Sequence, residues 1–292
     1  MTVFRKLLPR VLLYAAVALI LLWTLAPFYW MLATSVAGQR DLMSFPPAAI
    51  PPTITFERYV QLFGLADPSS IDVDIAVGAR LFRRALTNSI LVASATTVIG
   101  LVVGVIAGYA YARLKFSFSR SLLGITVMVH MLPPIATVIP LYMLLRQIGL
   151  LNSLTGLILV YSALAVTYVV WIMNGYFRSV PIELEESARV DGCTRLGALA
   201  RIVLPVVAPG IVATGLLVFI TMWNEFLYAL VLINDATSKT VPVMISEFST
   251  QERINYGMIM AGGVIVSLPP VLIAFIFQRR LVGGLTAGAV KG

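Results

Sequence analysis

The stretch EESARVDGCTRLGALARIVLP, residues 185–205, is the most polar long segment of an otherwise apolar chain. Between Arg178 and Arg201 the sequence gathers four acidic residues and four arginines, and hydrocarbon side chains resume directly after Pro205. A charge run of this kind is most often a solvated loop. Its internal pattern, however, predicts regular structure.

Two short helices with a bend between them are predicted within this segment. Pro181 marks the start of the first helix, where acidic residues in the first turns favour the helix dipole. Gly192 can supply a left-handed stop, and Thr194 can cap the second helix. Glu185 and Arg189 are spaced i, i+4 and are expected to pair.

Three apolar residues of this hairpin, Leu184, Val190 and Leu196, fall where few residues of the same chain can cover them. Exposed apolar groups ringed by charge are typical of a surface that binds another protein. The pattern therefore favours a docking role over a purely solvated loop.

The composition around the hairpin places the chain among membrane proteins. Of its 292 residues 59% are hydrophobic and 12% charged, and the mean hydropathy is +0.94, whereas soluble domains carry about a quarter charged residues. A bilayer core needs about 20 apolar residues per helix. The sequence thus predicts an all-α membrane protein with six transmembrane helices, at residues 11–36, 86–111, 121–145, 154–174, 206–231 and 258–278.

Basic residues predict the orientation of the six spans. With a cytoplasmic N-terminus, thirteen of the 21 Lys and Arg fall on the inner segments, which is the positive-inside distribution. The net charge of +8 then needs no nucleic-acid partner to explain it. Both termini and the hairpin are expected on the cytoplasmic side of the membrane, with the chain crossing it several times.

Polar residues and prolines inside the spans are candidates for a transport pathway. The third span contains His130 and the pair Pro133-Pro134, which predict a kink beside a pathway or a purely structural bend. The segment TMWNEFLYAL places further candidates inside the fifth span, and these are Trp223, Asn224, Glu225 and Tyr228. Ionisable groups in membrane helices usually face a polar cavity or a partner, although a structural hydrogen bond or interfacial anchoring is the alternative.

The hairpin resembles the EAA signature, E-A-A-x3-G-x9-I-x-L-P, of permease subunits in bacterial ATP-binding-cassette (ABC) importers. Glu186-Ser187-Ala188, Gly192 and the run Ile202-x-Leu204-Pro205 match it at full spacing, with Ser187 where the family usually has alanine.

Further stretches are similar to the carbohydrate-importer branch of the maltose-permease type. They are LTNSILVA, MLPPIATVIPLYMLLRQIGLLNSLTGLIL, GYFRSVPIELEESARVDG, ITMWNEFLYAL and FQRRLVGGLTAGAVKG. The resemblance implies a type I ABC importer permease fold. It divides the chain into a first helix with an extracytoplasmic segment at 1–85, a core at 86–281 with the coupling loop at 175–205, and a glycine-rich cytoplasmic tail at 282–292.

The resemblance also implies partners and roles. The coupling residues that would contact a separate ATPase dimer are Glu185, Glu186, Ser187, Ala188, Asp191, Gly192, Gly284 and Gly288. A second homologous permease subunit and an extracytoplasmic solute-binding protein would complete the importer of a di- or oligosaccharide. ATP and Mg would be bound by the ATPase and no cofactor or metal by this chain.

No Walker A pattern occurs in the sequence, so a chain with no catalytic role of its own is expected. The single cysteine, Cys193, excludes an intrachain disulfide. An ion-gradient-driven secondary transporter is the rival hypothesis from another class. Such proteins carry coupling charges within the membrane, and here only Glu225 and His130 are of that kind. A membrane scaffold without transport is a weaker third hypothesis.

Overall fold

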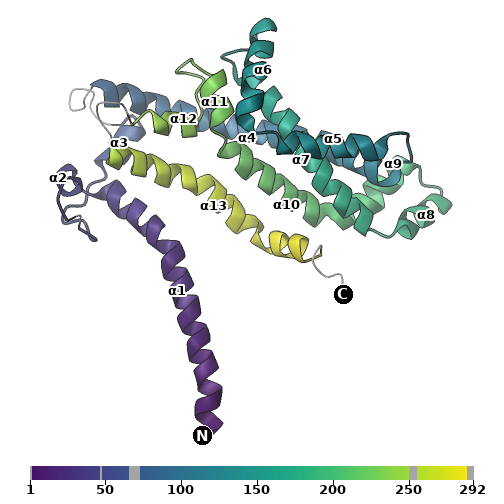
Figure 1. The fold of residues 1–292 in the computed structure, drawn as a ribbon, viewed down its shortest axis with the longest axis horizontal. Helices are drawn as coiled ribbons and strands as arrows, with labels where there is room; N and C mark the ends of the chain where they lie inside the picture. Colours follow the sequence, from purple (N-terminus) through teal and green to yellow (C-terminus); the bar gives the residue numbers. More distant parts are fainter. Residues whose placement is uncertain (1, 47, 66–72, 250–254, 288–292) are drawn as a thin grey trace. The chain divides into compact units, whose positions relative to one another are not determined.

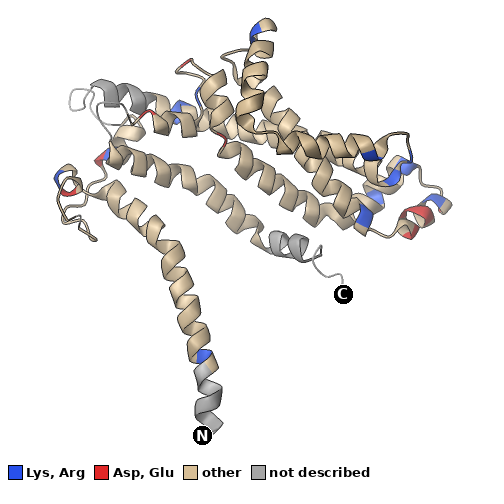
Figure 2. Ribbon diagram, in the orientation of Figure 1, with Lys and Arg blue, Asp and Glu red and all other residues tan. Residues whose placement is uncertain are grey.

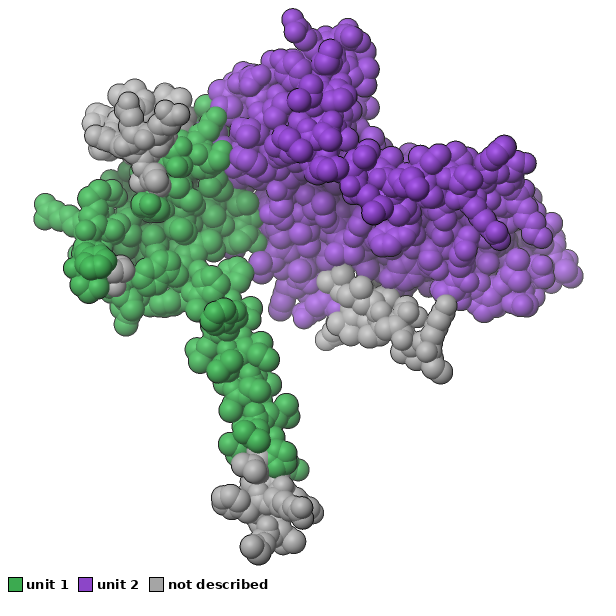
Figure 3. Space-filling view, viewed as in Figure 1, with its two compact units in different colours: residues 1–83, 245–267 green, residues 84–244, 268–292 purple. Residues whose placement is uncertain are grey.

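The computed structural model describes residues 2–46, 48–65, 73–249 and 255–287 and divides the chain into two compact units (Figures 1 and 3). Unit 1 comprises residues 1–83 and 245–267, and unit 2 comprises residues 84–244 and 268–292. The described residues are mainly helical, with one isolated β-bridge between Ala37 and Ile54. The helices are α1 (Thr2–Val36), α2 (Gln39–Leu42), α3 (Glu57–Leu62), α4 (Val73–Arg113), α5 (Ser119–Met131), α6 (Pro134–Gln147), α7 (Leu154–Ser179), α8 (Ile182–Val190), α9 (Arg195–Ala198), the π-turn η2 (Leu199–Val203), α10 (Leu204–Trp223), α11 (Leu227–Leu232), α12 (Val241–Ser246) and α13 (Tyr256–Ala287).

Within the described part of the chain, five stretches of helix are long and apolar enough to cross a bilayer. They are Pro9–Val36, Leu81–Arg113, Leu154–Ser179, Arg195–Trp223 and Tyr256–Gln278. The consecutive helices α5 and α6 together form a sixth, bent candidate. The predicted all-α membrane protein with six spans is confirmed when this bent pair is counted as one span.

The third predicted span is broken rather than merely kinked. Helices α5 and α6 meet at an angle of 100°. Leu132 is extended, as steric contact with a following proline favours, and Pro134 opens α6 at a position where a missing N–H costs nothing. Pro140, by contrast, lies inside α6 without ending it.

The fifth predicted span, 206–231, is also not one helix, and the expectation of a continuous run was wrong. Helix α10 ends at Trp223, and α11 begins only at Leu227. Asn224 and Glu225 therefore lie in a break between two helices, and not within a helical turn. Hydropathy does not report this break because the residues on both sides of it are equally apolar.

Helix α7 is the centre of unit 2, where it packs against α5 and α10 (Figure 1). It also lies against α4, whose glycines face it closely. A Cβ atom placed on Gly104 would lie 2.6 Å from the Cβ of Val169, and one on Gly100 would lie 2.8 Å from the Cβ of Ala165. Glycine at these positions allows the two backbones to approach, which is a common device between membrane helices.

In unit 1, Arg58 of α3 ties the segment after α1 to the end of that helix. Its buried guanidinium donates to the carbonyls of Ser35 (3.2 Å) and Ala37 (2.5 Å) and to the side chain of Gln39 (3.3 Å). Burial lowers the pKa of Arg58, but an arginine keeps its charge at any physiological pH. The positive charge thus satisfies carbonyls at the C-terminal end of α1.

Candidate functional site

The hairpin of unit 2 begins at α8 and turns at Gly192. Gly192 has φ +90°, so the predicted left-handed stop is confirmed. The Thr194 hydroxyl accepts a hydrogen bond from the amide of Gly197 at 3.1 Å, which confirms the predicted cap. The second helix is not a separate short helix, however, because α9 continues through η2 into α10.

This continuity follows from the π-turn. Residues 195–223 form one span. In a regular α-helix the ring of Pro205 would clash with the carbonyl of Arg201, four residues earlier. The π-turn η2 includes Arg201 and so widens the helix at this point. Wider π-turns of this type interrupt helices at functional sites more often than elsewhere. The tip of the hairpin is therefore joined directly to a membrane helix.

Glu185 lies at the root of the hairpin, the end where α8 meets α4. It was expected to pair with Arg189, but in the structure it contacts α4 instead. Its side chain is 6% exposed and turns inward to α4, where Tyr109 donates a hydrogen bond to Oε1. Arg113 Nε lies 3.3 Å from Oε2 as an ion pair. Arg113 also donates to the carbonyl of Val180 at 2.6 Å, directly before α8. Partners from a distant helix displace the local i, i+4 pair because they offer a buried, low-dielectric contact.

Acidic and basic residues follow one another along the hairpin (Figure 2), and exposed apolar side chains lie at its tip. Val190 is 88% exposed and Leu196 is 74% exposed, as the sequence predicted. Among the proposed coupling residues, Glu186, Ser187, Asp191 and Gly192 are exposed, whereas Glu185 and Ala188 are buried within the chain.

An open cavity of about 600 Å³ lies at the break between α5 and α6, with walls from α7, α10 and α11. Such a volume is within the range of ligand sites. Most of its lining is apolar, and two hydrogen-bonded pairs interrupt this lining. His130 Nε2 lies 2.8 Å from Thr167 Oγ1, and the hydroxyls of Thr137 and Tyr228 are 2.6 Å apart.

Glu225 also lines this cavity, and its carboxylate caps α11. Oε1 accepts from the amide of Tyr228 at 3.0 Å, and Oε2 accepts from the amide of Ala229 at 3.2 Å. The hydroxyl of Tyr161 on α7 donates to Oε2 as well. Tyr161 carried no signal in the sequence, because it lies 64 residues from Glu225 in an unbroken apolar helix.

Of the four pathway candidates in the fifth span, two line the cavity and two do not. Glu225 and Tyr228 line the cavity. Trp223 is 1% exposed and stacks on Phe219 with ring centroids 5.8 Å apart, so its ring is not presented to a sugar. Asn224 donates to the carbonyl of Ile220 at 2.8 Å and is not among the cavity residues.

Opposite the hairpin along unit 2, the loop after α11 is fixed to the N-terminal part of α4 in this unit. The amide of Asn88 donates to the carbonyls of Thr237 and Lys239, each at 2.9 Å. Within the loop, hydrogen bonds from Thr237 and Ser238 lower the pKa of the exposed Asp235 carboxyl. These bonds order a segment of the chain outside the membrane spans.

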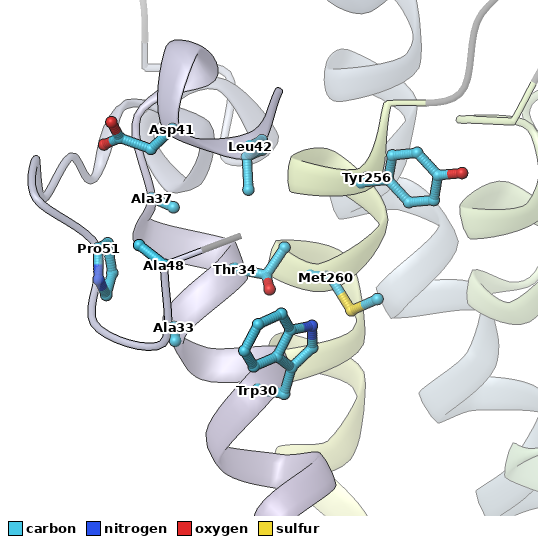
Figure 4. A pocket seen from close by; sticks show the side chains of 10 residues that line it. All are labelled: Trp30, Ala33, Thr34, Ala37, Asp41, Leu42, Ala48, Pro51, Tyr256 and Met260. Carbon is cyan, nitrogen blue, oxygen red and sulfur yellow. The ribbon is translucent and has the colours of Figure 1, made fainter. Parts of the chain in front are cut away.

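Unit 1 has a smaller cavity of about 170 Å³, which Figure 4 shows between α1, α2 and the start of α13. Trp30, Asp41 and Tyr256 are among its lining residues. The Asp41 carboxylate is already occupied by the hydroxyl and amide of Thr53. The cavity is below the roughly 300 Å³ at which ligand pockets begin.

Two further predicted residues lie in the C-terminal tail. Gly288 falls outside the described residues, and Gly284 is described only by its place in the backbone of α13. Among the residues that the structure describes, no group of three or more His, Cys, Asp or Glu could hold a metal ion.

The fold and this hairpin define a multi-pass α-helical membrane protein in which a polar two-helix loop extends directly from membrane helices. The chain belongs to the family of binding-protein-dependent transport system inner membrane components, whose model matches residues 100–286. This confirms the family resemblance and makes the protein an inner membrane component of a transport system.

Two curated relatives cover nearly the whole chain. A trehalose transport system permease protein of Mycobacterium tuberculosis is 37% identical over 92% of this chain and 93% of its own length. A sulfoquinovosyl glycerol transport system permease protein of Agrobacterium fabrum is 34% identical over 96% and 93%, respectively.

A solved structure shares the fold. A crystal structure of a bacterial ABC transporter that imports the acidic polysaccharide alginate contains a chain with a TM-score of 0.74 and 21% identity, covering 96% of this chain and 98% of that one. The predicted ABC importer permease fold is thereby confirmed.

Proposed function

We propose that this chain is the permease subunit of an ATP-driven ABC importer that carries a di- or oligosaccharide across the cytoplasmic membrane by alternating access. Family membership supports import with a binding protein, and the relatives' names support a sugar. These names include both an uncharged sugar and one with a sulfonate, so they leave the charge of the substrate open. The same membership argues against the ion-gradient alternative.

The observation that carries the coupling role is the contrast between the two ends of the hairpin. Its tip exposes Val190 and Leu196, whereas its root is held by the buried Glu185–Arg113 pair. A separate ATPase that binds ATP and Mg would cover the tip and contact Glu186, Ser187 and Asp191 beside it. Burying the apolar tip is the gain that favours this assembly.

Three connections would carry motion from the hairpin into the membrane. Helix α8 follows α7 directly in sequence, α9 continues into α10, and Glu185 binds α4 through Tyr109 and Arg113. Because the contacts are buried and the helices packed, displacement of the tip would move these helices together, as rigid-body switching requires. Glu185 is thus a positioning residue of the hairpin, and its neighbour Glu186 is the contact residue.

The remaining partners follow from the exposed surfaces and the charge distribution. A second permease subunit and lipid would cover the apolar helices, and an extracytoplasmic binding protein would deliver the sugar. Both termini and the hairpin would lie in the cytoplasm, as the positive-inside distribution favours.

Reconstitution into liposomes with the cognate ATPase, partner permease and binding protein tests this proposal. Sugar uptake should require ATP, and Val190→Glu with Leu196→Glu should abolish co-purification of the ATPase while membrane insertion is retained. Ile50→Glu, at an exposed apolar residue of the segment after α1, is the matched control and should leave the ATPase bound. Uptake that proceeds without ATP and follows a proton or sodium gradient would refute the importer function.

A further inference from the structure

The cavity of unit 2 combines apolar walls with very few polar groups. Pro134, Pro140 and Leu164 are typical of its walls, and the His130–Thr167 and Thr137–Tyr228 pairs supply hydroxyl and imidazole groups. The Thr137 and Thr167 hydroxyls donate to the carbonyls of Pro134 and Leu164, so the free oxygen lone pairs of these pairs can still accept from the hydroxyls of a ligand. Such a lining matches an uncharged sugar, which has apolar C–H faces and a rim of hydroxyls.

Glu225 gives this cavity a fixed negative charge. The carboxylate oxygens accept hydrogen bonds from two backbone amides and from the Tyr161 hydroxyl, which hold the group in place. These donors carry no net charge, so the net charge at this position stays negative. Among the described side chains that line the cavity, none is Lys or Arg.

An anionic substrate would therefore meet a like charge without a cationic group of this chain to offset it. Like charges at close range in this open cavity still repel one another, because the effective dielectric constant at a protein surface is well below that of bulk water. We propose that this cavity is a sugar subsite that admits uncharged sugars and that Glu225 excludes anionic ones, such as uronates, sulfonates or phosphate esters. This proposal rests on the importer function proposed above and selects the charge class of its substrate.

Equilibrium dialysis on the purified transporter, with this chain and its partner subunits but without the binding protein, tests the cavity itself. Trehalose and maltose are the uncharged probes, and a disaccharide of the same size that contains one uronic acid is the anionic probe. We expect the uncharged probes to bind more than about tenfold more tightly than the anionic one. Equal affinities, or tighter binding of the uronate, would overturn the proposal.

Two variants separate the charge from the shape of the cavity. Glu225→Gln keeps the size of the side chain and should reduce the preference for uncharged probes by more than about fivefold. Asp235→Asn removes the same charge from the exposed loop after α11, outside the cavity, and should leave the preference as it is. If Glu225→Gln keeps the same preference for uncharged over anionic probes, other groups exclude the anionic sugars and the role of Glu225 is refuted.

The outcomes also distinguish this inference from the function on which it rests. ATP-driven uptake of an anionic sugar in the reconstituted transporter would leave the importer function standing and refute the inference. Absence of ATP-driven uptake for sugars of either charge would refute both.

Discussion

At the scale of single residues, two carboxylates each connect one helical segment of unit 2 to another. Glu185 joins the hairpin to α4, and Glu225 joins α11 to α7 through Tyr161. Glu185 accepts one hydrogen bond and pairs with a cation, whereas both oxygens of Glu225 accept hydrogen bonds, as a charge removed from water requires. Each carboxylate holds two helical segments together through partners that lie on another helix.

Removing the charge of Glu185 should loosen the hairpin. Glu185→Gln leaves Arg113 buried without its counter-charge, which costs about 3–5 kcal/mol when the partner of a buried ion pair is lost. Thermal unfolding in detergent should show a lower midpoint for this variant, and ATPase activity in the complex should respond less to the loaded binding protein. Glu186→Gln, next to it but exposed, should leave the unfolding midpoint unchanged. Equal unfolding midpoints for the two variants would show that the Glu185–Arg113 pair does not stabilise the hairpin.

The bend of the hairpin requires glycine at position 192 because the backbone there is left-handed. Its φ of +90° disfavours any L side chain, whereas an added Cβ would meet no atom of this chain within 4 Å. Gly192→Ala should therefore destabilise the hairpin by about 1–2 kcal/mol through strain alone. Gly175→Ala, at an equally open site without positive φ, should be neutral or stabilising. Matching unfolding curves for the two variants would show that the bend tolerates a side chain.

At the scale of elements, the decisive features are where helices stop and where they continue. The α5–α6 bend and the α10–α11 break open the cavity, whereas the continuous path from α9 into α10 gives the hairpin a stiff connection. Close packing of α4 on α7 holds these elements in place, so substitutions at that contact should affect the whole bundle.

The glycine contacts of α4 can be tested directly. Gly104→Ala brings a methyl group to 2.6 Å from the Cβ of Val169, so the helices must separate, at a cost of about 1–3 kcal/mol. Thermal unfolding should show this loss, and adding Val169→Ala, which removes the Cγ1 that the new methyl group would meet at 2.7 Å, should recover part of it. Gly124→Ala on α5, where no atom lies within 4 Å, is the control and should not destabilise. Additive losses in the double variant would contradict direct contact between the two positions.

At the scale of the whole molecule, the native cysteine reports both orientation and assembly. Cys193 is the chain's only cysteine and is partly exposed beside the hairpin bend. A membrane-impermeant maleimide should label it in inside-out vesicles but not in sealed right-side-out ones. Labelling should slow when the ATPase is bound, because the partner would cover the bend. Labelling from the outer face would reverse the proposed topology.

Much of this molecule could be predicted from the sequence. Hydropathy located the apolar spans, and the charge pattern with Gly192 and Thr194 located the bend and cap of the hairpin. These features depend on the residues within one turn or one span. Local chemistry therefore determines them, and the exposed apolar tip follows from the same pattern.

The tertiary structure alone decided which partners the charged residues find. Glu185 pairs with an α4 arginine 72 positions away in the sequence and not with its neighbour Arg189. Glu225 caps the start of α11 and accepts a hydrogen bond from Tyr161 of α7. Hydropathy sums the transfer of side chains into lipid and does not register which distant donor reaches a buried carboxylate. The partners of Glu185, the broken fifth span and the cavity therefore appear only when the helices are packed, because each depends on contacts between segments far apart in the chain.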